Sequence, residues 1–272
     1  MLIKDLTIGQ YYATNSVVHK LDPRIKIVLL LALLVLIFCA TNLFSLAFLT
    51  ICIFGIQLVT KVPIRVYLKN LKIIIPILII TMLLNVFYVK DGTVLLEFWR
   101  IKITVGGVER SVFMGLRVVL LILASSVLTY TTTPNDLTDA IERLLSPLKV
   151  VGLGGAVHAM SMMMTIALRF IPTLVEETEK IICAQKARGA DFESGSLKKR
   201  VKAIIPILIP LLISSVRRAY DLAEAMESRC YNGGVGKKRM KVLKISRNDI
   251  LSVILVVLLF AFVIVFNVLL KV

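Results

Sequence analysis

The feature that most constrains the fold is an almost unbroken apolar stretch from Ile27 to Val59, interrupted only by the polar pair Thr41-Asn42. As one helix rising about 1.5 Å per residue, this stretch would be roughly 50 Å long, which exceeds a single crossing of a hydrocarbon layer about 30 Å thick. We therefore predict a helical hairpin that crosses a membrane twice, with its turn near Thr41-Asn42.

Composition supports a membrane protein. Of the 272 residues, 58% are hydrophobic and 18% are charged, whereas soluble domains average about 45–50% and about 25%. The mean hydropathy is +0.88. These values exclude a cytosolic enzyme of ordinary composition, because the apolar stretches are too long to close over one soluble core.

The same criteria predict three further spans, and basic residues orient the chain. The spans are 73–89, 112–131 and 250–270. Basic residues flank the hairpin on both outer sides: Lys20, Arg24 and Lys26 before it, and Lys61, Arg65, Lys69 and Lys72 after it. Since cytoplasmic loops are rich in Lys and Arg, both ends of the hairpin and the N-terminus should be cytoplasmic.

The charge balance also follows from this orientation. The chain has 33 Lys and Arg against 17 Asp and Glu, a net charge of +16. The basic cluster at 237–247 has no interleaved aromatic residues, so it favours the lipid surface over nucleic acid as a partner. The loop 90–110 is nearly neutral and is expected outside, where 101–105 alternate like a strand.

The region from Thr133 to Asp249 contains 19 basic and 12 acidic residues. Two apolar stretches in it, 159–171 and 203–216, are shorter than a span and favour re-entrant or interfacial helices. Each continues into a charged amphipathic helix. A shorter helix precedes them, opening at Thr133-Pro134 with capping chemistry and ending near Ser146-Pro147.

The predicted fold is therefore an all-α membrane protein with about five transmembrane helices plus three amphipathic coupling helices on the cytoplasmic side. We divide it into an N-terminal membrane domain with four spans (1–132), a coupling-helix platform (133–234), and a basic loop with the C-terminal span (235–272).

The two long helices of the platform are expected to end alike. One ends at Ala187-Arg188-Gly189 and the other at Ser228-Arg229-Cys230. An arginine in a last turn followed by a small residue is ordinary helix-ending chemistry. The duplication favours a second interpretation, in which small neighbours let a partner close around each guanidinium.

Other candidate sites are weaker. Met160, Met162, Met163 and Met164 fit either core filling or a soft surface that repacks against partners. The glycine-rich segment 233–238 resembles a phosphate loop, but Tyr231 and Lys238 stand where Gly and Ser or Thr are required. Four cysteines without CxxC spacing and two histidines suggest no metal site. We thus expect no catalytic residues and no cofactor in this chain.

Several of these segments together resemble the transmembrane T subunits of energy-coupling factor (ECF) transporters. They are the Ala-Arg-Gly tip, Leu168-Arg169-Phe170-Ile171-Pro172, the 217–227 run, the helix from Asp136-Leu137 to Pro147-Leu148, and Leu21-Asp22-Pro23-Arg24. The resemblance covers most of the chain and is strongest over 134–234.

This resemblance implies a function. ECF transporters are ATP-binding-cassette importers of vitamins and metals in the prokaryotic cell membrane. By the resemblance, Arg188 and Arg229 dock in two cytosolic ATPases that bind ATP and Mg, and the long helices hold a membrane-embedded substrate-binding S subunit. The methionines suit an exchangeable S subunit. Ser228 and Cys230 depart from the Ala and Gly that are common in the second motif.

The rival hypothesis is a self-contained secondary carrier or channel. Carriers need ionisable or ion-coordinating groups near the bilayer midplane. The predicted spans contain none apart from Arg117, which is expected near the end of the span 112–131. The charge pattern therefore favours a non-catalytic coupling subunit over a carrier.

Overall fold

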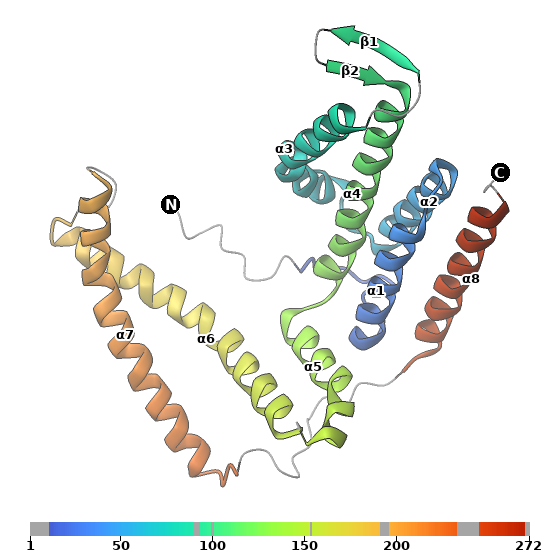
Figure 1. The fold of residues 1–272 in the computed structure, drawn as a ribbon. Coiled ribbons are helices and arrows are strands. Elements are labelled where there is room, and N and C mark those ends of the chain that lie inside the picture. Colours follow the sequence, from blue (N-terminus) through green and yellow to red (C-terminus); the bar gives the residue numbers. More distant parts are fainter. Residues whose placement is uncertain are drawn as a thin grey trace. The chain divides into compact units, whose positions relative to one another are not determined.

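The computed structural model describes residues 11–89, 93–98, 101–152, 154–190, 196–232 and 245–269. Over these residues all the regular elements are helices apart from one antiparallel strand pair (Figure 1), which confirms the predicted all-α membrane class. The chain divides into two compact units. Among the described residues, the membrane unit consists of 11–133 and 245–269, and the platform unit lies within 134–232.

The element bounds follow the chain in order. The membrane unit contains α1 (Pro23–Cys39), α2 (Leu43–Thr60), α3 (Ile64–Tyr88), β1 (Val94–Phe98), β2 (Ile101–Thr104), α4 (Val105–Thr131) and α8 (Arg247–Leu269). The platform unit contains α5 (Pro134–Leu144), the 3-10 helix η1 (Ser146–Val151), α6 (Gly154–Ala187) and α7 (Leu197–Glu227).

The predicted hairpin is confirmed as α1 and α2, which break at residues 40–42. Asp22 caps α1 by accepting a hydrogen bond from the Arg24 amide at 2.9 Å, and Pro23 occupies the first helical position. The early Leu-Asp-Pro-Arg motif therefore starts a membrane helix.

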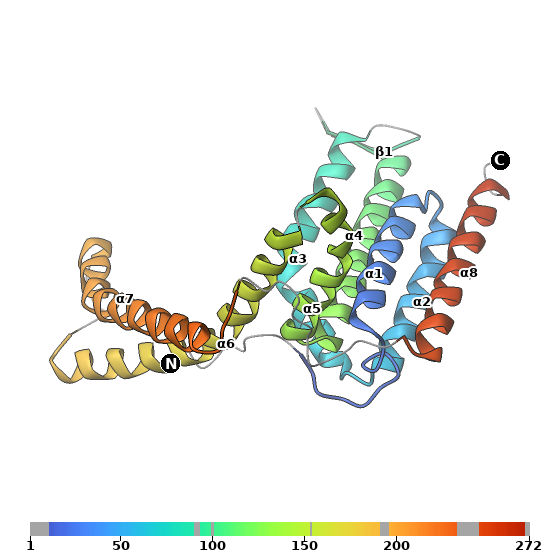
Figure 2. The same ribbon diagram turned by 90° about the horizontal axis from the view of Figure 1, so that it is seen from below.

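The core of the membrane unit lies where α1, α2, α4 and α8 meet. Both views of the ribbon show these helices side by side (Figures 1 and 2). Their fully buried side chains include Leu36, Leu49, Leu120 and Val263, each with no exposed surface. Many outward-facing apolar side chains remain exposed, as expected for helices whose solvent is lipid.

Two predicted span starts are corrected. α4 begins at Val105 rather than 112, because the Thr104 hydroxyl accepts a hydrogen bond from the Gly107 amide at 3.2 Å and caps the helix there. α3 begins at Ile64 rather than 73, so Pro76 lies in the helix interior instead of near its start. The predicted strand at 101–105 is confirmed up to Thr104, and it pairs antiparallel with β1.

The apolar stretches 159–171 and 203–216 continue into their charged segments, as predicted. They lie within continuous helices of 34 and 31 residues, since the charged segments after them extend the same helices. Over the described residues, six helices are long and apolar enough to span, and α6 and α7 are among them. Length and composition alone therefore do not place these two helices.

Small residues let α3 and α4 approach closely. Gly107, Ser111 and Gly115 recur every four residues on α4, a pattern that brings membrane helices together. The Ser111 hydroxyl donates to the Met82 carbonyl at 2.8 Å. A Cβ added at Gly107 would lie 2.8 Å from the Val89 carbonyl oxygen, closer than side-chain carbons are found.

We therefore expect Gly107→Ala to destabilise the membrane unit by about 1–3 kcal/mol, the usual cost of overpacking. The matched control is Gly55→Ala in α2, where an added Cβ meets nothing within 4 Å. The control should be neutral or stabilising by up to about 1 kcal/mol, because alanine favours helix. Thermal unfolding in detergent measures both. Equal melting temperatures for the two variants would contradict the close approach of α3 and α4.

His19 organises the segment before α1. Its Nε2 lies 3.0 Å from the Tyr12 carbonyl oxygen and its Nδ1 lies 2.7 Å from the Ser16 hydroxyl. This arrangement fits a neutral ring that donates from Nε2 and accepts at Nδ1. Burial, with the charge of Lys26 as a smaller cause, lowers the pKa of His19 below its usual 6.5 despite the opposing Tyr12 carbonyl.

This lowered pKa predicts a pH dependence of stability. As the pH falls below 6.5, the unfolded chain takes up a proton at His19 before the folded chain does, so stability is full above that pH and falls below it. Melting temperatures measured from neutrality down to about pH 5 should fall further for the wild type than for His19→Gln. An identical decline in both proteins would remove His19 from this role.

Candidate functional site

The end of α6 forms a complete Schellman motif around Arg188. The Gly189 amide donates to the Lys186 carbonyl at 2.9 Å, and the Ala190 amide donates to the Gln185 carbonyl at 3.0 Å. Gly189 adopts a left-handed conformation with φ 85°, which glycine accepts without strain. Arg188 therefore directly follows Ala187, the last residue of α6, and precedes the left-handed glycine at which the chain turns away.

The end of α7 repeats the same geometry around Arg229. The Cys230 amide donates to the Glu227 carbonyl at 2.8 Å, and the Tyr231 amide donates to the Met226 carbonyl at 3.0 Å. Cys230 is left-handed with φ 56°. The two arginine tips, defined as 187–189 and 228–230, thus share one backbone structure, although their sequences share only the arginine.

Neither arginine side chain is needed to end its helix. The final carbonyls already accept backbone amides, and the Ser228 hydroxyl donates to the Ala225 carbonyl at 3.0 Å. Arg188 and Arg229 are both exposed, and within the described part of the chain neither guanidinium has a hydrogen-bond or ion-pair partner. Two helices whose ends are fixed by backbone hydrogen bonds therefore present guanidinium groups that no described residue binds. This arrangement favours the partner interpretation over simple helix capping.

The two tips lie far apart. Figure 1 shows the C-terminal end of α6 beside the start of α7, with the far end of α7 directed away from both. The two tips therefore lie at different ends of the α6–α7 pair.

An ion pair joins the two helices midway between the tips. Arg218 Nη2 on α7 lies 2.7 Å from Glu177 Oε2 on α6. Glu177 precedes Arg188 by 11 residues, and Arg218 precedes Arg229 by 11 residues. About three helical turns therefore separate the ion pair from each tip, so the two tips are equally distant from it along their helices.

A second polar cluster fixes the beginning of α6 to α5. His158 Nδ1 lies 3.1 Å from Glu142 Oε1, and the Ser161 hydroxyl donates to Glu142 Oε2 at 2.9 Å. Ser161 is buried. α6 is thus held at its beginning by this cluster and, about three turns before its end, by the ion pair with α7.

The methionines lie mostly on the surface of this chain. Met160 and Met163 are 64% exposed and Met164 is 52% exposed, while Met162 is half-buried. Core filling within this chain therefore does not explain them. α7 also exposes Leu208, Leu212 and Ile213, so an apolar surface continues along both helices of the platform.

The left-handed residues of the tips provide a test of their shared structure. Gly189→Ala places a Cβ in a left-handed conformation at a cost of about 1–2 kcal/mol, and no neighbour lies within 4 Å of that Cβ. Amide hydrogen exchange at Ala190 should accelerate about tenfold. Cys230→Gly should slow exchange at Tyr231 by a similar factor.

The control for this pair is Gly155→Ala in α6, where an added Cβ also meets nothing within 4 Å and the backbone is not left-handed. It should leave both amides unchanged. Unchanged exchange at Ala190 in Gly189→Ala would contradict the Schellman geometry of the tip.

Two structural features were missed in the sequence. Asp249 has no exposed surface, and it accepts the Asp22 amide at 2.8 Å and the Ser246 amide at 2.7 Å. It thereby joins the starts of α1 and α8. The Ser-x-x-Asp spacing at 246–249 is a capping signal that predicts the second of these bonds.

Arg117 is the other correction. It lies 12 residues after the start of α4 and 14 before its end, near the middle rather than near the end. Its Nη2 donates to the Ala40 carbonyl at 2.6 Å, and its guanidinium lies 4.7 Å from the Phe113 ring centre. Asn267 of α8 similarly donates to the Cys39 carbonyl at 2.8 Å. These two side chains hold the turn between α1 and α2.

The glycine-rich segment 233–238 and the basic residues 237–244 lie outside the described residues. Cys183 and Cys230, both exposed, are the thiols near the two tips.

Comparison with known proteins agrees with these features. Residues 14–242 match the CbiQ family, described as cobalt transport protein. The chain is 48% identical over 250 residues to the energy-coupling factor transporter transmembrane protein EcfT of Ruminiclostridium cellulolyticum, covering 92% of each chain. It is 42% identical over 260 residues to EcfT of Bacillus subtilis, covering 96% of this chain and 97% of that one.

The resemblance drawn from the tips and the flanking motifs is thereby confirmed, and the match extends well beyond them into the membrane unit. The chain belongs to the CbiQ family, among the transmembrane EcfT proteins of energy-coupling factor transporters.

Proposed function

We propose that this chain is the non-catalytic coupling subunit of an ATP-driven importer in the prokaryotic cell membrane, with each arginine tip docked in one of two cytosolic ATPases. The observation that carries this proposal is the duplicated tip: two helix ends with the same backbone hydrogen bonds, each with an exposed arginine. A pair of equivalent grooves on two ATPases suits two equivalent tips.

In the proposed mechanism, the platform transmits movement of the ATPases to the rest of the transporter. ATP and Mg bind to the ATPases, and closure of the ATPase pair moves the two tips relative to each other. Because the Glu177–Arg218 ion pair joins α6 and α7 at 2.7 Å, movement at a tip is passed along the helix to its partner. The His158–Glu142 contact passes movement of α6 on to α5.

The exposed apolar surface of α6 and α7 is the proposed contact with a membrane-embedded S subunit that selects vitamins or other micronutrients. Met160, Met163 and Met164 contribute to it. Methionine is flexible and polarizable, so such a surface adapts to different S subunits. Exposed apolar side chains that lie together, as they do on these two helices, are typical of a protein interface.

The central position of Arg117 does not favour the carrier hypothesis. Its guanidinium contacts the Ala40 carbonyl and the Phe113 ring, both within the membrane unit. Ala40 follows the last residue of α1, so the Arg117 guanidinium binds a carbonyl at the end of that helix. Arg117 therefore has a structural role in holding the turn between α1 and α2.

The test is purification of the tagged full-length chain from its native membranes, with identification of its partners and reconstitution of uptake. We expect two ATP-binding-cassette ATPases and at least one small membrane protein, with uptake that requires ATP. Uptake driven by an ion gradient by the chain alone would instead support a carrier.

A further inference from the structure

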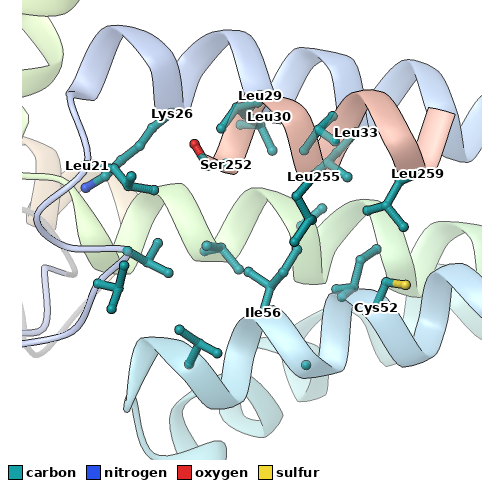
Figure 3. A pocket seen from close by; sticks show the side chains of 18 of the residues that line it. Leu21, Lys26, Leu29, Leu30, Leu33, Cys52, Ile56, Ser252, Leu255 and Leu259 are labelled. Atoms are coloured by element: carbon teal, nitrogen blue, oxygen red, sulfur yellow. The ribbon is translucent and has the colours of Figure 1, made fainter. Parts of the chain in front are cut away.

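An apolar cavity opens within the membrane unit between α1, α2, α4 and α8 (Figure 3). Its volume is about 710 Å³, within the range of about 300–1,000 Å³ that ligand pockets occupy. Leu255 and Leu259 of α8 face Ile56 and Cys52 of α2 across it (Figure 3). The cavity belongs to neither of the two tips nor to the apolar surface of the platform.

One position in the wall of the cavity has no side chain. Gly55 lines it, and a Cβ built at Gly55 meets nothing within 4 Å. The cavity is also open to its surroundings, since Val59, Leu251 and Leu255 line it and are at least half exposed. Around these helices the surroundings are hydrocarbon, so an apolar chain entering from the bilayer meets an apolar wall.

One end of the cavity is polar and positively charged. Lys26 lies there, and its ammonium donates to the Thr131 carbonyl at 2.9 Å and the His19 carbonyl at 3.2 Å. Asn248 and Ser252 of α8 line the same cavity. This is the end at which α1 and α8 begin, the end that the basic flanks assign to the cytoplasm.

The charges around this end suit an anion. The segments 16–26 and 245–252 contain four basic residues, Lys20, Arg24, Lys26 and Arg247, and two acidic residues, Asp22 and Asp249. Both acidic residues are buried, at 5% and 0% exposure, whereas Lys20 and Arg247 are exposed. Lys20 and Arg247 are direct neighbours in the chain of the lining residues Leu21 and Asn248.

We infer that the cavity binds one acyl chain of an anionic phospholipid of the cytoplasmic leaflet, with the phosphate of its headgroup near Lys20 and Arg247. The apolar wall accommodates the acyl chain, and the basic end favours phosphatidylglycerol over zwitterionic phosphatidylcholine. This lipid fills a cavity that would otherwise be empty beside the α2 and α8 contact. The inference does not depend on the docking of ATPases.

The experiment reconstitutes the full chain with its native partners in phosphatidylcholine vesicles that contain a minor fraction of a photoactivatable lipid. The probe is phosphatidylglycerol with a diazirine in its acyl chain, and a matched phosphatidylcholine probe is used in parallel. Cross-linked peptides are mapped by mass spectrometry. We expect enriched labelling at Cys52 and Leu255 with the anionic probe, displaced by excess unlabelled phosphatidylglycerol.

Two variants make the test specific. Gly55→Phe fills the cavity and should abolish this labelling, while Leu58→Phe adds the same ring to an exposed position of α2 that does not line the cavity and should retain it. Lys20→Gln and Arg247→Gln should each reduce the preference for the anionic probe roughly fivefold, the contribution of one basic residue beside an anionic bilayer.

Complex composition by size-exclusion chromatography confirms that each variant assembles. The inference would be overturned if the cavity residues were labelled no more strongly than Ile79 and Ile80, which are exposed on α3. It would also be overturned if Gly55→Phe left the labelling unchanged. Equal labelling by both probes would overturn its anionic part. Cross-links from the cavity to a partner protein would show that a protein segment fills the cavity instead.

Discussion

Uptake should be lost when Arg188 and Arg229 are both replaced by alanine. Truncating one partner of a desolvated charged contact costs roughly 2–5 kcal/mol, much of it from the unpaired group left behind. Each single variant should therefore lose about 30-fold or more in affinity for the ATPases, and the double variant should lose stable association. ATP-dependent uptake in vesicles and ATPase co-purification measure the effect.

The matched control is Arg217→Ala, which removes an exposed arginine from the same helix as Arg229. It should keep both uptake and ATPase association. Lysine at 188 or 229 should restore less than arginine, because an ammonium lacks the planar fork that pairs with carboxylates. Wild-type uptake with full ATPase retention in the double variant would disprove the docking role.

Removal of the Asp249 carboxylate is the second change with a large expected effect. Asp249→Ala leaves the buried amide of Asp22 and the part-buried amide of Ser246 without their acceptor. Each unsatisfied buried group costs about 1–3 kcal/mol, so α8 should loosen from the start of α1. We expect a lower melting temperature in detergent and faster hydrogen exchange at the first turn of α8.

Two variants control for this result. Asp221→Ala removes an exposed aspartate from α7 and should leave the melting temperature unchanged. Asp249→Asn retains one acceptor oxygen and should fall between the wild type and Asp249→Ala. If Asp249→Ala melts like Asp221→Ala, the carboxylate does not join the two helices.

Elements with a local chemical signal were predictable from the sequence. The hairpin turn at 40–42, the α5 helix that starts at Pro134, and the two helix ends at Arg188 and Arg229 all have such signals. They follow from span length, capping chemistry and small residues, which act over a few neighbouring residues.

Features that depend on distant partners were not predictable in the same way. The central position of Arg117 emerges only once α4 is seen to start at Val105, and its partner Ala40 is 77 residues away. The Asp22–Asp249 bond spans 227 residues. The continuation of the apolar stretches of α6 and α7 into charged halves was predicted. Their ability to span was judged from the apolar stretch alone, whereas each whole helix is long and apolar enough.

The structure around Cys230 was predictable only in part. The first tip has Ala187 and Gly189 beside its arginine, whereas the second has Ser228 and Cys230. The structure has the same Schellman bonds at both ends nevertheless, with cysteine at φ 56° where the first tip has glycine. The backbone hydrogen bonds thus preserve the tip despite a residue that is strained in this conformation.

The central claim is that both arginine tips lie on the cytoplasmic side and are covered by the ATPases. Cys183 and Cys230 are exposed and lie five residues and one residue from Arg188 and Arg229. Single-cysteine variants retaining one of them, with Cys39 and Cys52 replaced, can be labelled with a membrane-impermeant thiol reagent.

The most direct measurement compares this labelling in intact cells and in inside-out vesicles, with and without the ATPases bound, and with opened membranes as the control for thiol reactivity. We predict no labelling of either thiol from outside, labelling of both in stripped inside-out vesicles, and protection of both when the ATPases are added back. Labelling of Cys183 from outside intact cells would place Arg188 across the membrane from Arg229 and contradict the account.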